Sequence, residues 1–189
     1  TGYKAWAELS PEAKKQVAKN FIFMVEESIA VGSKFSTPSF SRSLFKLMVS
    51  GNDFQLINET MQSLFKIMKS TNAKFLVMGN YLSSARGHVR PSGYKDFRES
   101  IKFCLQTASD ILRDMRFKID QRNLDQISLP VAYIFEALVD FQGFDQRQAA
   151  VLIQFFTNVQ LNELGPKSIV VGYSSLASLV AKYKIDVVL

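Results

Sequence analysis

Apolar residues recur at steps of three and four along most of this chain, and this spacing constrains the possible fold more than any other feature. Positions three or four apart share one face of an α-helix, whereas a half-buried strand alternates at every second residue. The helical spacing is clearest in Phe54, Ile57, Met61, Leu64, Phe65 and Met68. Two short runs, 169–171 and 187–189, leave strand and helix both open. We therefore expect an all-α fold.

Two sites in the first third of the chain combine a capping hydroxyl with a proline suited to the first helical turn, namely Ser10-Pro11 and Thr37-Pro38. Gly32 is typical of the C-terminus of the helix that starts at Ser10. Asn52 or Asp53 can cap the helix that follows the one starting at Thr37-Pro38. On the first of these helices we expect an apolar stripe of Val17, Phe21, Met24, Val25 and Ile29.

Further start and stop signals bring the expected number of helices to about seven to nine. One of them is expected to be short and weak, because Gly79 lowers its helix propensity. The last segment opens at Gly165. The other expected helices are 73–84, 94–118, one from Ser128-Leu129-Pro130 to Gly143, and one capped by Asp145.

Residues 86–93 are the clearest loop, since Gly and Pro occupy three of their eight positions. No repeat, low-complexity tract or long linker marks a domain boundary elsewhere. We expect one compact multi-helix bundle over 11–184, with an N-terminal arm, 1–10, and a C-terminal tail, 185–189. The alternative is a domain of two lobes, 11–85 and 94–184, joined by the basic loop 86–93.

The 189 residues include one Cys, Cys104, and one His, His88. One Cys cannot form an intrachain disulfide, and the two residues cannot build a Cys₂His₂ or Cys₄ zinc site within one chain. We expect His88 to be an exposed loop residue and Cys104 to be a small buried hydrophobe. The sequence therefore favours a protein that is not an enzyme, with no catalytic residues, no metal site and no cofactor.

The formal charge of +6 is concentrated in the middle of the chain. Residues 66–118 hold eleven Lys or Arg and four Asp or Glu, so the remainder of the chain is nearly neutral. On the expected helix 94–118, bases and acids fall on different faces. The apolar face is Tyr94, Phe97, Ile101, Leu105, Ala108, Leu112, Met115 and Ile119. The acidic face is Asp96, Glu99, Asp110 and Asp114. The basic face is Lys95, Arg98, Lys102, Gln106, Ser109, Arg113 and Arg116.

A basic helix face preceded by a basic loop is typical of proteins that bind the phosphates of a nucleic acid without reading its bases. The competing interpretation is a face that is merely solvated. The separation of acids from bases raises the first interpretation to equal weight, because a solubilising helix usually carries mixed pairs one turn apart. The expected phosphate-binding residues are Arg86, Arg90, Tyr94, Lys95, Arg98, Lys102, Arg113 and Arg116.

Large aromatic residues predict surfaces for self-association. The segment 151–156 is apolar almost all round, so its helix is either central to the fold or in contact with a partner subunit. The N-terminal arm carries Trp6, which can dock on its own core or into a neighbouring subunit. The expected self-association residues are Tyr3, Trp6, Phe155 and Phe156.

The longest apolar run near the N-terminus, 21–25, is too short for a signal-peptide core or a membrane span. We therefore expect a soluble or peripheral protein of the cytoplasm or of a virion. The preferred hypothesis is a non-enzymatic, self-assembling, nucleocapsid or coat-like subunit that binds nucleic acid, most readily single-stranded RNA.

The alternative hypothesis is a helical sensor or carrier with an apolar ligand in its interior. The strings Leu9-Ser10-Pro11-Glu12 and 88–94 are similar to pieces of globins. Where globins carry the haem-ligating His, this chain has Ser84. The resemblance therefore implies a haem-less globin-like bundle.

Overall fold

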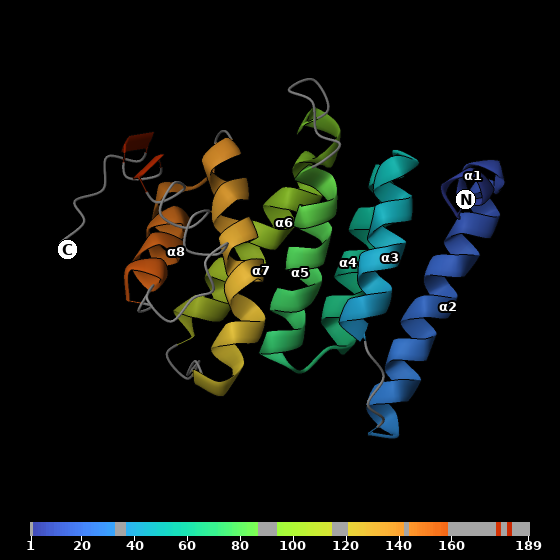
Figure 1. The fold of residues 1–189 in the computed structure, drawn as a ribbon, viewed down its shortest axis with the longest axis horizontal. Coiled ribbons are helices and arrows are strands. Elements are labelled where there is room, and N and C mark those ends of the chain that lie inside the picture. Colours follow the sequence, from blue (N-terminus) through green and yellow to red (C-terminus); the bar gives the residue numbers. More distant parts are fainter. Residues whose placement is uncertain are drawn as a thin grey trace. The chain divides into compact units, whose positions relative to one another are not determined.

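The computed structural model describes residues 2–32, 37–86, 94–114, 121–141, 144–158, 177–178 and 181–182. These residues contain no strand, which confirms the all-α class, whereas 169–171 and 187–189 lie outside them. Eight helices are delimited, in the order shown in Figure 1. They are α1 (Gly2–Glu8), α2 (Pro11–Ala30), α3 (Thr37–Ser50), α4 (Phe54–Ile67), α5 (Thr71–Arg86), α6 (Tyr94–Arg113), α7 (Gln121–Asp140) and α8 (Gln146–Asn158).

The chain divides into two compact units, Thr1–Ser100 and Ile101–Leu189. The first unit holds α1 to α5 and the beginning of α6, and the second holds the rest of α6 with α7 and α8. Of the expected basic loop 86–93, residues 87–93 lie outside the description, as does the expected tail 185–189.

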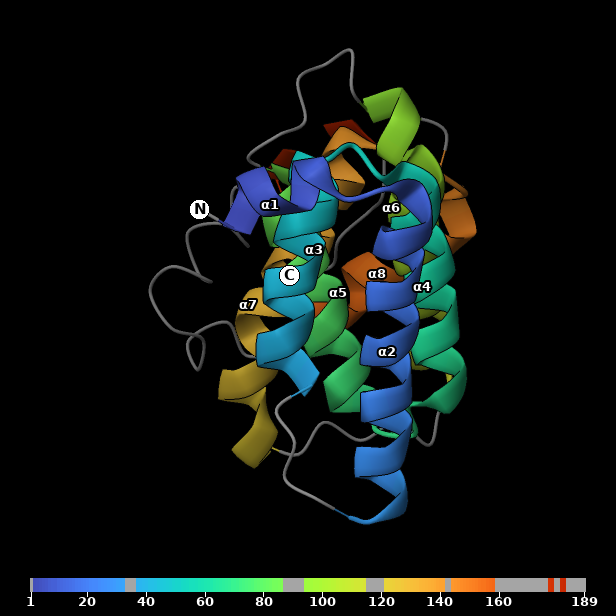
Figure 2. The ribbon, with the colours of Figure 1, turned by 90° about the vertical axis from the view of Figure 1, so that its right-hand side faces the viewer.

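In the first unit, α3 packs against α5 and α4, α2 packs against α4, and α1 packs against α3. Figures 1 and 2 show these helices side by side, with α2 at the edge of the unit. The rings of Phe45 and Tyr81 meet edge to face with centroids 5.6 Å apart, which links α3 to α5. The core between the helices is made of fully buried side chains, among them Phe45, Met48, Ile57, Met61, Leu64, Phe75 and Tyr81.

The expected start and end of α2 are both confirmed. Ser10 is its N-cap, and the Ser10 Oγ accepts a hydrogen bond from the Ala13 N–H at 3.2 Å. This bond satisfies one of the amides that a helix N-terminus leaves without an intrahelical partner. At the other end Gly32 has a φ of +62°, a left-handed conformation that glycine adopts without steric cost.

Helix α5 is longer than the expected helix 73–84, since it runs from Thr71 to Arg86. Glycine costs about 1 kcal/mol in a helix interior, but Gly79 is buried in this helix. Helix α5 packs against α3, and Ser41 on α3 and Ser84 on α5 are both buried. The amide of Asn80 on α5 donates to Ser41 Oγ on α3 at 3.3 Å. Tertiary packing therefore outweighs the local cost of the glycine.

Two expected boundaries in the second unit are wrong. Helix α6 ends at Arg113 rather than Lys118, and α7 begins at Gln121 rather than near Ser128. The sequence predicts a helix start at Pro130, but Pro130 lies inside α7. A proline lacks the N–H that an interior position normally donates, yet Pro130 and the four residues that follow it are buried. Burial of this apolar segment keeps the helix continuous through the proline.

Asp145 caps α8 as expected, because its Oδ1 accepts a hydrogen bond from the Gln148 N–H at 2.9 Å. The expected end of the preceding helix, Gly143, lies outside the described residues, and α7 itself ends at Asp140. Lys182, from the short helical stretch 181–182, donates from Nζ to the Val139 carbonyl at 2.7 Å and to the Leu138 carbonyl at 3.2 Å. A cation at this place also suits the negative end of the α7 dipole.

Candidate nucleic-acid interface

Helix α6 separates an apolar face from a basic one, as its sequence predicts. Phe97, Ile101, Leu105 and Ala108 of the expected apolar face are all buried. Cations of the expected basic face are exposed, namely Arg98, Lys102 and Arg113. A helix anchored through one face in this way holds its charged side chains at fixed spacings along the other.

Ser109 departs from the expected pattern. The spacing places it on the basic face, but it is fully buried, and its Oγ donates to the Gln148 carbonyl of α8 at 3.4 Å. The interruption separates Lys102 from Arg113, which are eleven residues apart and so about 16 Å apart along the helix axis. The basic face is therefore divided into an Arg98–Lys102 pair and a separate Arg113.

The remaining expected phosphate-binding residues are not tested at the level of side chains. Arg86 ends α5, and Tyr94 and Lys95 begin α6, but the description of these three residues is limited to the backbone. Arg90 and Arg116 lie outside the described residues, as does His88. Of the acidic face, Glu99, Asp110 and Asp114 are exposed.

Cys104 is fully buried on α6, which confirms its expected place in the core. Burial in an apolar environment raises the pKa of the Cys104 thiol far above its ordinary value, because the charged thiolate would be poorly solvated there. Ser84, at the place where the globin resemblance puts a haem ligand, is buried in α5 and donates from Oγ to the Asn80 carbonyl at 2.7 Å.

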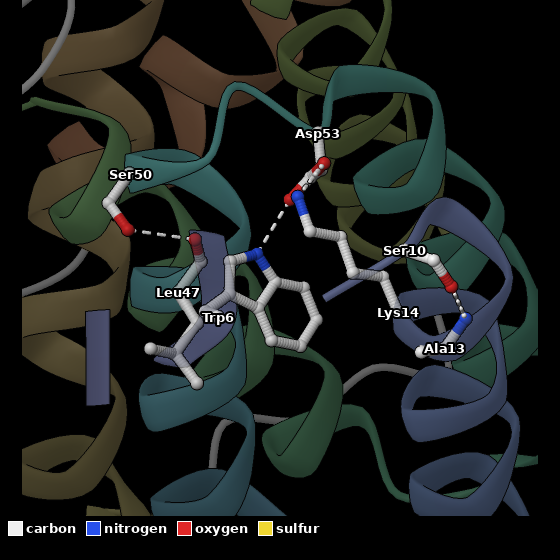
Figure 3. Close-up of polar contacts among 7 residues, drawn as sticks. All are labelled: Trp6, Ser10, Ala13, Lys14, Leu47, Ser50 and Asp53. Atoms are coloured by element: carbon white, nitrogen blue, oxygen red, sulfur yellow. Dashed lines mark hydrogen bonds and ion pairs between the residues drawn. The ribbon is translucent and has the colours of Figure 1, made fainter. Parts of the chain in front are cut away.

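Trp6 docks on its own chain in this structure, and its assignment to self-association stays a prediction. Residues 2–8 of the expected arm form α1, and the Trp6 side chain is buried on its own chain, with 3% of its surface exposed. The Trp6 Nε1 donates to Asp53 Oδ2 at 2.7 Å (Figure 3). Self-docking, one of the two roles that the sequence left open, is therefore the observed one. Tyr3 is about half exposed, and the side chains of Phe155 and Phe156 are not described.

Asp53 joins three helices, a role that no pattern in the sequence indicates. It occupies the N-cap position of α4, but its side chain makes no capping hydrogen bond. Instead its Oδ1 accepts from Lys14 Nζ on α2 at 3.0 Å, and the same Nζ lies 5.6 Å from the Trp6 ring centroid. Gly51 leaves the room this requires, because a Cβ there would lie 2.5 Å from Asp53 Oδ2 and 2.9 Å from Trp6 Nε1.

A surface pocket of about 480 Å³ adjoins this cluster. It lies where α2 and α4 begin, and charged groups from Lys14, Lys15 and Asp53 line it. The carboxylate of Asp53 is already shared by Lys14 and Trp6. The pocket is thus part of the structural junction between α1, α2 and α4.

The α2 stripe expected in the core is only partly buried. Phe21 and Val25 are buried, but Val17, Met24 and Ile29 are 40%, 46% and 42% exposed. The sequence pattern of α2 marks these positions as apolar and carries no signal that separates the buried ones from the exposed ones.

No helix within the described ranges is long and apolar enough to cross a membrane. Comparisons of the chain with protein-family models, with curated proteins and with solved structures found no significant match.

Proposed function

We propose that this protein binds the sugar-phosphate backbone of a nucleic acid, preferentially a single strand of RNA, as a self-assembling structural subunit without catalytic activity. The observation that supports the proposal is the exposed basic face of α6, held in place by the burial of its apolar face. Contacts of Lys and Arg with phosphates supply most of the sequence-independent affinity for nucleic acids.

The arrangement of charge on α6 fits phosphate binding better than it fits a face that is merely solvated. Lys102 and Arg113 form no ion pair with any residue that the structure describes. Arg98 and Lys102 are four residues apart, so their Cα atoms rise by about 6 Å along one side of the helix. Two such cations can contact neighbouring phosphates of a flexible single strand, and neither contact depends on base identity.

The proposal predicts the behaviour of the double variant Arg98→Ala with Lys102→Ala. Loss of two phosphate contacts should reduce the slope of log K against log salt by about 1.4 for a single strand. Filter binding of the full chain to a homopolymeric RNA, between low and moderate salt, measures this slope. The matched control is Lys46→Ala with Lys69→Ala, which removes two exposed cations from the first unit and should leave the slope nearly unchanged. Equal binding by the wild type and the α6 variant at low salt would contradict the proposal.

A further inference from the structure

Helix α1 is held to the rest of the first unit by one buried side chain. Trp6 is 3% exposed, and the other six residues of this seven-residue helix are all exposed. Isolated helices of fewer than about 12 residues are marginal in water, so the helical form of α1 depends on its docking. The docking of α1 in turn depends on Trp6 as its single anchor.

The socket of Trp6, which we define by Lys14, Gly51 and Asp53, is built entirely from residues outside α1. Lys14 Nζ donates to Asp53 Oδ1 at 3.0 Å, which leaves Oδ2 to accept from the indole N–H at 2.7 Å (Figure 3). Gly51 keeps the socket open, because a Cβ there would lie 2.9 Å from Trp6 Nε1. The socket therefore has the same complementarity for α1 of another copy as for its own α1.

The connection between α1 and α2 is short, since it consists of Leu9 and Ser10 alone. Figure 2 shows the chain changing direction at this connection, and Pro11 occupies the first turn of α2 directly after it. Short connections invite the exchange of an element between copies, because in the exchanged form the connection can extend instead of bending back. The connection is also apolar in part, with Leu9 37% exposed.

We propose that two copies of the chain exchange α1, so that Trp6 of each copy occupies the socket of the other. The exchange is reciprocal about a twofold axis, and every contact of α1 seen within one chain is formed again between two chains. Because each connection has only two residues, the two connections lie beside the twofold axis and bring the two Leu9 side chains together. This apolar contact exists only in the dimer, so it favours the dimer over two self-docked chains.

This inference rests on the proposed function only in naming the contact of its self-association, and it is tested without nucleic acid. Sedimentation velocity of the full chain between about 1 µM and 500 µM should show a dimer that forms with increasing concentration. The Arg98→Ala, Lys102→Ala variant should dimerise as the wild type does, which separates this test from that of RNA binding. A monomer throughout the range would overturn the exchange and leave nucleic-acid binding intact.

A longer connection should return α1 to its own socket. We expect a Gly-Ser-Gly-Ser insertion between Leu9 and Ser10 to weaken the dimer at least tenfold, because the longer connection bends back without cost. The fluorescence of Trp6, the sole tryptophan, should stay as in the wild type, since its socket is filled in both forms. The matched control is the same insertion after Lys69, between α4 and α5, which should retain the dimer. An unchanged dimer in the first variant would contradict the exchange.

Crosslinking distinguishes an exchanged α1 from a self-docked one. A Cβ at Gly2 would lie 3.9 Å from Leu47 Cδ2 on α3, and the sole native thiol, Cys104, is buried. Gly2→Cys chains and Leu47→Cys chains, mixed and refolded together from urea, should form mixed disulfides under mild oxidation, whereas either variant alone should form few. A chain that carries both substitutions should form a covalent dimer on a non-reducing gel. An intramolecular disulfide in that chain, without mixed disulfides in the mixture, would refute the exchange.

Discussion

At the scale of single residues, Asp53 shows how one side chain can link several helices. Its two carboxylate oxygens accept from an indole N–H and from an ammonium group, and the three residues come from different helices or their caps. The side chains of Lys14 and Asp53 are only 13% and 18% exposed. Ion pairs at this depth are less screened by water than surface pairs, which contribute about 0–1 kcal/mol. The cluster therefore anchors α1 to the start of both α2 and α4.

The variant Asp53→Ala should lower the free energy of unfolding by about 1–3 kcal/mol, because it leaves the buried Trp6 N–H and the Lys14 ammonium without their acceptor. Asp53→Asn should lose less, since an amide oxygen can still accept from one donor. Urea unfolding followed by circular dichroism and by Trp6 fluorescence measures both variants. Equal stability of Asp53→Ala and the wild type would show that the cluster is dispensable.

At the scale of elements, α7 shows how far burial can override a local signal. Pro130 lies in its interior, where proline costs about 3 kcal/mol relative to alanine. The segment that follows, Val131 to Ile134, is buried throughout. Its burial offsets the cost of the proline and holds one helix across the position at which the sequence predicts a start.

Replacement of this proline therefore has a predictable sign. Pro130→Ala should raise the free energy of unfolding by about 1–3 kcal/mol, since it restores a helical N–H and removes the steric conflict of the ring. The replacement also removes the packing of the buried proline ring, and this loss reduces the gain in stability toward the lower end of that range. Pro11→Ala is the matched control, because Pro11 is at the first position of α2, where proline is well tolerated. Chemical denaturation of both variants measures their free energies of unfolding. A loss of stability in Pro130→Ala would contradict the view that this proline destabilises α7.

At the scale of the whole molecule, the proposed phosphate binding and the proposed self-assembly are linked. The basic face of α6 would bind phosphates, and an assembly of several copies would present several such faces. Linking two binding sites raises the overall affinity through the effective concentration of the second site, with no new contact.

A comparison of strand lengths tests this linkage. For the wild type, a long RNA that reaches several copies should bind at least tenfold more tightly per site than a short oligonucleotide that reaches one. The variant Arg98→Ala with Lys102→Ala should weaken the binding of both RNAs, because both contact the basic face of α6. Fluorescence anisotropy with both RNAs at one salt concentration provides the measurement. Equal affinity per site of the wild type for the long and the short RNA would show that RNA binding is independent of self-assembly.

Features that depend on near neighbours were predictable from the sequence. The caps Ser10 and Asp145, the stop at Gly32 and the buried face of α6 all involve residues within one or two turns of each other. Hydrogen bonding and periodicity over such distances follow from residue order alone. The all-α class and the exposure of Arg98 and Lys102 follow from the same local pattern.

Only the tertiary structure decided which partners meet across the chain. Trp6 and Asp53 are 47 residues apart in the sequence, and Ser109 lies 39 residues from Gln148. No periodicity shows that Asp53 holds an indole and a lysine instead of capping α4, or that α8 covers Ser109 on the basic face. Likewise, the sequence marks both Val17 and Phe21 as apolar positions of α2, but packing buries Phe21 and leaves Val17 exposed. A sequence encodes which faces are apolar, whereas burial depends on the neighbouring helices that cover those faces.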